Sequence, residues 1–511
     1  GPAMSRALAY LGAAIPQKAL CVICAIVVVV ALGGGAVDAA EIHSNGSGGG
    51  AWTDPATWHG GAVPGAADDV VIAMRDVVVC DIVDPQQPAC RNLYIDPEGV
   101  LSFDEGGGHY VLAVDGSIES YGLIRMDGTK TARGIRELRL LAFDGPPRIV
   151  FKQNAGVLAY VREGLARGER NVRIITLGPG EEGPRHVTTI FADGDVMIDL
   201  HHAQVTDVVV ELRNLDNTGA QTTERLNIVG NRFTGLARLM FVGCDTPVVR
   251  ENRFEAGDLT VPNAAIHVHT CKLAELRANL IDGAYERGLF VQTDVDSSAL
   301  DNAISGCGRG VCWRGVHAMT RGNAIEQWPI GFLAVNMTGV IEQTVVTGAA
   351  EAFQFNNVEA QMTDCRVEGI PEDGFAMTLN NSTATLLNCN IMDDQLNLQA
   401  SRGGAPFVTA MAYLVVRLAG EVPPAAMVEA RTAEVSGGVP AGKADLNVRN
   451  SPAPPDRTGL TPLPRSTRAM VVRSWSVAAD KKIVSPPFYG LRVLSPPATP
   501  NEPPKVVKTV E

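Results

Sequence analysis

Short apolar runs alternate with turn residues along most of the chain, and from about residue 228 to 391 this pattern becomes a repeat. Segments such as "IVGNRF", "VRENRF", "LRANLI" and "TRGNAI" recur at intervals of 21 to 27 residues. The fourth position of each segment is polar or a cysteine, and the position two places later is always apolar. The fourth positions are Asn231, Asn252, Asn279, Asn302, Asn323, Thr344, Cys365 and Cys389, and the apolar positions are Phe233, Phe254, Ile281, Ile304, Ile325, Val346, Val367 and Ile391.

A repeat of this length, built from β-branched runs, predicts the coils of a parallel β-helix. One coil cannot bury its apolar face alone, so coils stack about 4.8 Å apart and share a core. Asparagines at one inward position of successive coils can hydrogen-bond to each other, which satisfies amides that are costly to bury. A leucine-rich horseshoe has a similar period but needs a leucine-rich consensus, which is absent. We therefore predict an all-β chain with a single-stranded parallel β-helix over residues 92–410.

A second periodic set is aromatic. Phe332, Phe353 and Phe375 precede the repeat position at a nearly constant offset, and we expect them to stack inside the coils. Upstream, residues 110–128 and 194–214 have the alternation of further, less regular coils.

The last hundred residues differ in character from the repeat. Fifteen of the 31 prolines follow residue 420, and short apolar runs there are separated by turns. Residues 421–498 loosely resemble the small immunoglobulin-like or carboxypeptidase-regulatory-like sandwiches of secreted proteins. We expect a small β-sandwich there and a disordered tail over residues 499–511.

The net charge and the N-terminal stretch indicate which partners the protein lacks and where it is located. The 511-residue chain has a net charge of −13 and no cluster of lysine and arginine, which argues against a nucleic-acid partner. Its first four residues look like the remnant of a purification tag. Lys18 then precedes an apolar stretch in which Val37 and Ala39 fit the cleavage site of a signal peptide. Residues 1–40 are therefore interpreted as tag remnant and signal peptide, with a membrane anchor as the alternative. We expect a secreted protein, or one at a cell or virion surface.

The stretch "WTDPATWHGGAVPGAADDVVI" and the segment after it resemble the eight-glycine domain of secreted and cell-surface proteins, including animal proteins that bind or cleave hyaluronan. The matching residues are Trp58, Gly60, Gly61, Pro64, Asp68, Asp69, Val71, Ile72, Leu93, Ile95, Gly99, Leu101 and Phe103. The resemblance implies that residues 41–105 form the first coils and cap of a right-handed β-helix. A cap is needed because an open end exposes unpaired strand edges. Trp52 and Trp58 are then packing residues of the cap, with stacking on a sugar as the alternative role.

Hyaluronan-handling relatives carry a histidine strand similar to "AAIHVHTC", which here contains His267 and His269. The family then has a second histidine strand and an acidic strand. Gln292 and Trp313 stand where those strands fall, so the chain departs from the family's hydrolytic pattern.

The residues around this strand form the candidate site. Alternation sends Ile266 and Val268 inward and places His267 and His269 on the outer face. The repeat places Phe290 and Gln292 beside them on the next coil. We expect Glu286 and Arg287 on the preceding turn, and Asp294 and Asp296 just beyond. His267, His269, Glu286 and Asp294 are the candidate catalytic residues for acid and base work on a glycan, and Gln292, Asp296 and Arg287 the candidate ligand-binding residues.

Three other interpretations of this surface remain open. The two imidazoles could bind a metal weakly, the residues could contact a ligand passively, or they could be solvated side chains on a face that is polar in any case. Carboxylate pairs such as Asp193 with Asp195 or Asp199 carry little information alone, because acidic residues are common in β-helix turns. We predict no cofactor, and nothing in the sequence establishes a calcium site.

Two functional classes follow. In the first, the chain binds a polysaccharide, and if it also cleaves it the enzyme is a glycoside hydrolase or a polysaccharide lyase. In the second, it is a structural surface protein, such as an adhesin or virion appendage, that uses the β-helix as a rigid rod. A groove lined by the candidate catalytic residues favours the first class.

Eight cysteines remain after the leader, an even number in a chain expected to be exported. Cys244 and Cys271 each lie eight residues before a repeat position, so they stack on neighbouring coils and are our favoured disulfide. Cys80 and Cys90 bracket a short loop and are a second candidate. The alternative is a column of free thiols, which is favoured for Cys365 and Cys389.

Overall fold

A computed structural model describes the chain from residue 40 onward, with gaps. The described residues are 40–83, 87–127, 134–143, 145–152, 155–160, 172–178, 186–215, 226–293, 297–315, 317–326, 329–391, 393–400, 406–417, 427–432, 467–478, 488–494 and 506–510. Side chains are described as far as residue 410. The leader therefore lies outside the described residues. Among the residues that are described, no helix has the length and apolar character needed to cross a membrane.

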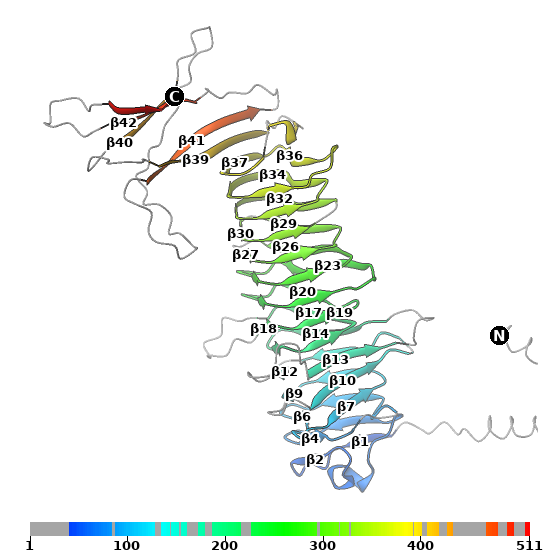
Figure 1. Ribbon diagram of the computed structural model, residues 1–511. Coiled ribbons are helices and arrows are strands. Elements are labelled where there is room, and N and C mark those ends of the chain that lie inside the picture. The colour runs from blue at the N-terminus through cyan, green and yellow to red at the C-terminus, as the bar shows by residue number, and fades with distance from the viewer. Residues whose placement is uncertain are drawn as a thin grey trace, which may run out of the picture.

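The chain winds into three stacks of parallel strands that form one long column (Figure 1). This confirms the predicted parallel β-helix. The first stack contains β1 (Glu41–His43), β3 (Asp69–Ile72), β5 (Asn92–Ile95), β8 (Ile118–Ser120), β11 (Arg148–Phe151), β14 (Thr188–Asp193), β17 (Val208–Arg213), β20 (Arg238–Val242), β23 (Val261–His269), β26 (Tyr285–Thr293), β29 (Arg309–Gly315), β32 (Ile330–Glu342), β34 (Glu351–Thr363), β36 (Phe375–Asn380) and β38 (Leu396–Gln399).

The second stack shares the long strands β32 and β34 with the first, because each of them pairs through both of its halves. Its other members are β2 (Gly49–Ala51), β4 (Val77–Cys80), β6 (Val100–Phe103), β9 (Leu123–Asp127), β12 (Gly156–Tyr160), β15 (Met197–His201), β18 (Leu226–Val229), β21 (Val248–Arg250), β24 (Glu275–Arg277), β27 (Ser297–Leu300), β30 (His317–Arg321), β37 (Thr383–Leu387) and β39 (Phe407–Arg417). The third stack contains β7 (His109–Val114), β10 (Ile135–Leu141), β13 (Val172–Leu177), β16 (Gln204–Thr206), β19 (Arg232–Thr234), β22 (Arg253–Glu255), β25 (Leu280–Asp282), β28 (Ala303–Ser305), β31 (Ala324–Glu326), β33 (Val345–Thr347) and β35 (Arg366–Glu368).

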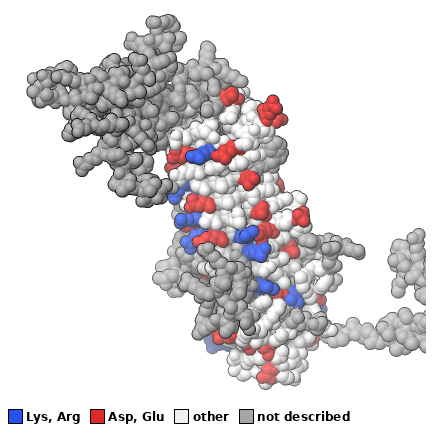
Figure 2. All heavy atoms as spheres, in the orientation of Figure 1, with Lys and Arg blue, Asp and Glu red and all other residues white. Residues whose placement is uncertain are grey.

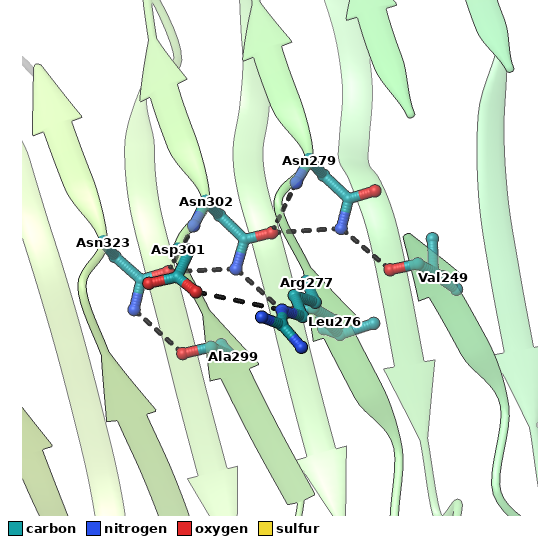
Figure 3. Close-up of polar contacts among 8 residues, drawn as sticks. All are labelled: Val249, Leu276, Arg277, Asn279, Ala299, Asp301, Asn302 and Asn323. Carbon is teal, nitrogen blue, oxygen red and sulfur yellow. Dashed lines mark hydrogen bonds and ion pairs between the residues drawn. The ribbon is translucent and has the colours of Figure 1, made fainter. Parts of the chain in front are cut away.

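A ladder of asparagine side chains runs through the turn that precedes the third stack (Figure 3). Asn302 shows the pattern: its Nδ2 donates to Asn323 Oδ1 at 2.9 Å and to Leu276 O at 3.0 Å. Its Oδ1 accepts from both the backbone N–H and the Nδ2 of Asn279, each at 3.0 Å. All five predicted ladder asparagines are buried. The sequence repeat thus corresponds to a continuous column of hydrogen bonds, in which each buried asparagine amide has its partners.

The residue before each ladder position adopts a left-handed backbone conformation. Gly230, Asp301 and Gly322 have φ of 65°, 56° and 70°. This conformation is easy for glycine and tolerated by aspartate and asparagine, but it strains Glu251 and Ala278, which occupy the same place. The turn geometry is therefore set by the ladder and the stacked strands, which hold it even where the local residue disfavours it.

The core consists of columns of one apolar residue per coil. One column runs in strict register from Val205 through Phe233 and Phe254 to Ile281, and the two phenylalanine rings stack with centroids 4.6 Å apart. The second aromatic column is partly as predicted. Phe332 and Phe353 are buried partners, but the next position is Met377, while Phe375 is only half-buried and pairs with Glu351. The assignment of Phe375 to the column is therefore wrong.

The N-terminal end is closed by η1 (Pro55–Thr57), η2 (His59–Gly61) and two buried tryptophans. The Trp52 and Trp58 rings meet edge to face with centroids 5.0 Å apart, and Trp58 Nε1 donates to Trp52 O at 2.7 Å. Both side chains are at most 2% exposed, so they pack the cap and present no ring to a sugar. Gly49 has φ +85°, and a Cβ there would lie 2.2 Å from Val77 O, so the cap strand approaches β4 as only glycine permits.

The described strands of the C-terminal part are antiparallel. β41 (Thr467–Ala478) pairs with β39, and β40 (Met427–Thr432), β42 (Phe488–Leu494) and β43 (Val506–Val510) form a three-stranded sheet. β43 lies within residues 499–511, where the sequence predicts a disordered tail; the structure instead has a paired strand. Of the segment 421–498 only these strands are described, so a complete sandwich stays a prediction. The short helix η3 (Asp393–Gln395) lies between β37 and β38.

All eight described cysteines are thiols in this structure. Cys244 and Cys271 stack on neighbouring coils, where the Cys244 N–H donates to Cys271 Sγ at 3.3 Å. Cys365 Sγ donates to Ile341 O at 3.4 Å, so the thiol takes over the ladder position in the last coils. The disulfides Cys244–Cys271 and Cys80–Cys90 stay predictions for oxidised protein.

The described surface carries charges of both signs. On the face in Figure 2, acidic and basic side chains are interspersed among uncharged residues. A strand face on which side chains of one charge sign predominate is therefore a candidate binding site.

Candidate functional site

The predicted histidine strand is β23, and it alternates as expected. Ile266 and Val268 are fully buried, whereas His267 and His269 are half-buried on the outer face of the first stack. His267 pairs with Phe290 and His269 with Gln292 on β26. The geometry therefore places four outward side chains in a two-by-two array on adjacent coils.

His267 is held uncharged at neutral pH. Its ring stacks on Phe290 with centroids 4.6 Å apart and an interplanar angle of 17°, and it meets His269 edge to face at 6.0 Å. Burial, and then the positive charges of His269 and Arg287, lower the pKa of His267 from 6.5 to about 4. The neutral imidazole is a proton acceptor.

Arg287 contacts the Phe290 ring of the same array. Its guanidinium is 4.4 Å from the centroid of the Phe290 ring and pairs with Glu286 at 2.7 Å. Glu286 and Arg287 were predicted to lie on a turn, which is wrong: β26 begins at Tyr285 and includes both. The strand is longer because β23 starts at Val261 and, past an irregularity before Ala264, pairs with β26 over this whole length.

Arginines on β29 extend the array to a third coil. Arg309 pairs with Arg287, and Arg314 pairs with Gln292. Between them, Cys312 pairs with Phe290 and is 5% exposed on the outer face; burial raises the pKa of its thiol. Arg287, Arg309 and Arg314, here called the arginine cluster, all act electrostatically on that thiol. Arg309, Cys312 and Arg314 were not among the candidates from the sequence. Alternation in "RGVCWRG" that sends Val311 and Trp313 inward could have placed Cys312 and Arg314 on the outer face, whereas Arg309 stands at the start of the strand.

Two polar atoms in this array lack a hydrogen-bond partner among the described residues. They are the buried Nε2 of His267 and Nε of Arg287, whose side chains both contact the Phe290 ring. Buried polar groups in native proteins are almost always paired with protein or with ordered water, so these two atoms are available to a water or to a polar ligand.

The other predicted site residues are only partly placed. Asp294 and Asp296 lie outside the described residues. Gln292 lies between His269 and Arg314 in the strand register. The metal interpretation finds no support in the part of the chain that is described, where no group of three or more potential ligands could hold an ion.

Outside this array, on the second stack, His201 lies beside a carboxylate. His201 Nε2 is 2.7 Å from Asp199 Oδ1, with Asp199 almost fully buried. Asn227 pairs with Asp199 on the next coil. From the sequence, Asp199 was considered only as a member of a carboxylate pair, whereas in the structure its partner is His201.

Comparisons with known proteins give likenesses of fold only. None of the known protein families matches the chain, and no curated protein matches it. Among solved structures, a mutant of a periplasmic alginate epimerase is 12% identical, with a TM-score of 0.31 over 68% of this chain and 86% of that one. Tailspike protein 3 of bacteriophage CBA120 is 10% identical, with a TM-score of 0.27 over 62% of this chain and 56% of that one. The A-module of a mannuronan C-5 epimerase from Azotobacter vinelandii is 12% identical, with a TM-score of 0.19 over 61% of this chain and 91% of that one.

Proposed function

We propose that the protein binds an acidic polysaccharide across the outer face of β23, β26 and β29, and that His267 removes a proton from the bound sugar. The observation that carries this proposal is the array itself. An uncharged histidine on β23 stacks on Phe290 of β26, and three arginines lie on β26 and on the next strand, β29.

The arginine cluster supports the choice of an acidic ligand. Guanidinium groups match carboxylates in charge and in planar geometry, and they form paired hydrogen bonds with them. Glu286 neutralises Arg287 in part, since they form an ion pair, but its side chain is 50% exposed and can be displaced by a ligand carboxylate. A uronate carboxylate placed here also reaches the unpaired Nε of Arg287.

The chemistry that fits a neutral histidine beside arginines is elimination from a uronate. His267 accepts the proton from C5, the electrons of that C–H bond form the C4–C5 double bond, and the C4–O bond to the next sugar breaks. The leaving oxygen takes a proton from water. Arginine at the carboxylate stabilises the negative charge that develops next to C5. A bound anion also offsets the positive charges that lower the pKa of His267, so ligand binding makes this histidine a stronger base.

The wider setting of the protein is also part of this proposal. We propose that the chain is exported, that its first coils are related to the eight-glycine domain, and that a polysaccharide is its partner. The buried tryptophan cap supports the second point. The competing function, a rigid surface rod without a ligand, predicts that the array binds no polymer.

A polymer panel tests the proposal. We expect the protein to bind hyaluronan or polygalacturonate but not neutral dextran, and to release products with the ultraviolet absorbance of an unsaturated uronate. Replacing Arg309 and Arg314 together with glutamine should weaken binding at least tenfold, since two charge-assisted contacts are lost. Arg232 and Arg253 are the control, because they are likewise two surface arginines but lie on the third stack, where they pair on neighbouring coils.

Three results separate the possible outcomes. Equal loss of binding in the control pair would show that general charge, not this array, attracts the polymer. Binding without an unsaturated product would contradict elimination. No binding to either acidic polymer would favour the rod.

A further inference from the structure

A groove of about 540 Å³ lies on the first stack at the N-terminal end of the column. It crosses β1, β3, β5 and β8, and its lining includes His43, Tyr94, Asp96 and Glu119. The same outer face carries the His267 array. Six strand steps separate β5 from β23, which at about 4.8 Å per step places the two sites roughly 29 Å apart.

Tyr94 lines this groove, and Tyr121 lies beside it. Tyr94 projects outward from β5, between the buried Leu93 and Ile95, and Tyr121 follows β8. Their ring centroids are 5.7 Å apart and the rings are inclined by 48°. Both side chains are only half-buried. Partly exposed rings of this kind are surfaces on which a flat apolar face or a cation packs.

The charge of the groove is opposite to that of the arginine cluster. Four carboxylates line it: Glu41, Asp69, Asp96 and Glu119. Three of them have basic neighbours: Arg91 pairs with Asp69 at 2.9 Å, Lys152 Nζ lies 3.8 Å from Glu119, and His43 Nε2 lies 2.7 Å from Glu41 Oε1. The carboxylates outnumber the cations by two when His43 is neutral and by one when it is protonated. The groove therefore repels a uronate and attracts a sugar that carries a positive charge.

We infer that this groove is a saccharide site for a hexosamine with a free amine. The sugar ring packs on Tyr94 and Tyr121, its ammonium group contacts the carboxylates, and its hydroxyls donate to them. The site is independent of the proposed uronate chemistry, since it uses other residues and a ligand of opposite charge. A polymer that contains both amino sugars and uronates can occupy both sites of the face at once.

Calorimetric titration at pH 6, where a sugar amine is protonated, tests the inference. The probes are the hexamers of glucosamine, N-acetylglucosamine and galacturonate. We expect the glucosamine hexamer to bind and the N-acetylated hexamer to bind at least tenfold more weakly, since acetylation removes the charge. Tyr94→Ala should weaken glucosamine binding about tenfold, and Tyr94→Phe should stay within threefold because it keeps the ring. Glu119→Gln should also weaken it, with the fold checked by a thermal melt.

The inference is overturned if the acetylated hexamer binds equally well, or if Tyr94→Ala and Glu119→Gln both leave glucosamine binding unchanged. It is equally overturned if the glucosamine hexamer does not bind. The galacturonate hexamer, with the Arg309 and Arg314 double variant, reports on the proposed function separately. Either site can therefore fail in this experiment without the other.

Discussion

Asn302→Ala is expected to lower the free energy of unfolding by about 3 kcal/mol, because it interrupts the ladder in its middle. The substitution removes the acceptor of the Asn279 N–H and the donor to Leu276 O. Both backbone groups lie in the core, where an unpaired polar group costs about 1–3 kcal/mol. The measurement is urea denaturation followed by circular dichroism.

The matched control for this substitution is Asn357→Ala. Asn357 also bonds to an asparagine one coil away, Asn336, at 3.0 Å, but its side chain is exposed. Its left-handed φ of 55° adds a backbone cost of about 1 kcal/mol on substitution. A loss at Asn302 no larger than at Asn357 would contradict the view that the buried ladder stabilises the fold.

His267→Ala is expected to reduce kcat on an acidic polysaccharide by 10²- to 10⁴-fold, the usual contribution of a positioned base. KM should change little, because the arginine cluster supplies the binding. The thermal melt should stay near that of the unsubstituted protein, since His267 faces outward and its loss opens no core cavity. Initial rates of unsaturated product formation give both constants.

His317→Ala is the control for this second substitution. His317 is an exposed histidine on β30 of the second stack, with its Nδ1 2.9 Å from Thr338 Oγ1. It should leave kcat unchanged. A His267 variant with full turnover would move the catalytic base elsewhere, and the Asp199–His201 pair would then be the next residues to replace.

The ladder and the coils were predictable because they obey a strict local rule. A buried amide needs a partner on each adjacent coil, so the same residue type recurs at the same turn, and the intervals of the sequence repeat are those of the hydrogen bonds. The same rule explains the error at Phe375. Phe332 and Phe353 each lie twelve residues before a ladder position, as does Met377, whereas Phe375 lies fourteen before Cys389. Spacing from the ladder, not the aromatic character, decides which residue enters the column.

The candidate site was predictable only along the strand. Alternation placed His267 and His269, and the repeat placed Phe290 and Gln292. Arg287 was named, but it was placed on a turn, because the irregular pairing before Ala264 that lengthens β26 leaves no sign in the repeat. Arg309 and Arg314 were missed because they lie on β29, one coil beyond the strands that were considered. The pairing of Asp199 with His201 was missed for a related reason: it depends on which strand face each side chain takes, which a search for carboxylate pairs does not consider.

The most direct test of an acidic-saccharide site at His267 is the titration of that histidine by NMR in protein labelled with ¹³C-histidine. The resonance is identified by its absence in His267→Gln. The account predicts a pKa of about 4 in the free protein, which rises when the galacturonate hexamer is bound, because a carboxylate then offsets the charge of Arg287. A pKa near 6.5 in the free protein, or one that the hexamer does not change, would contradict it.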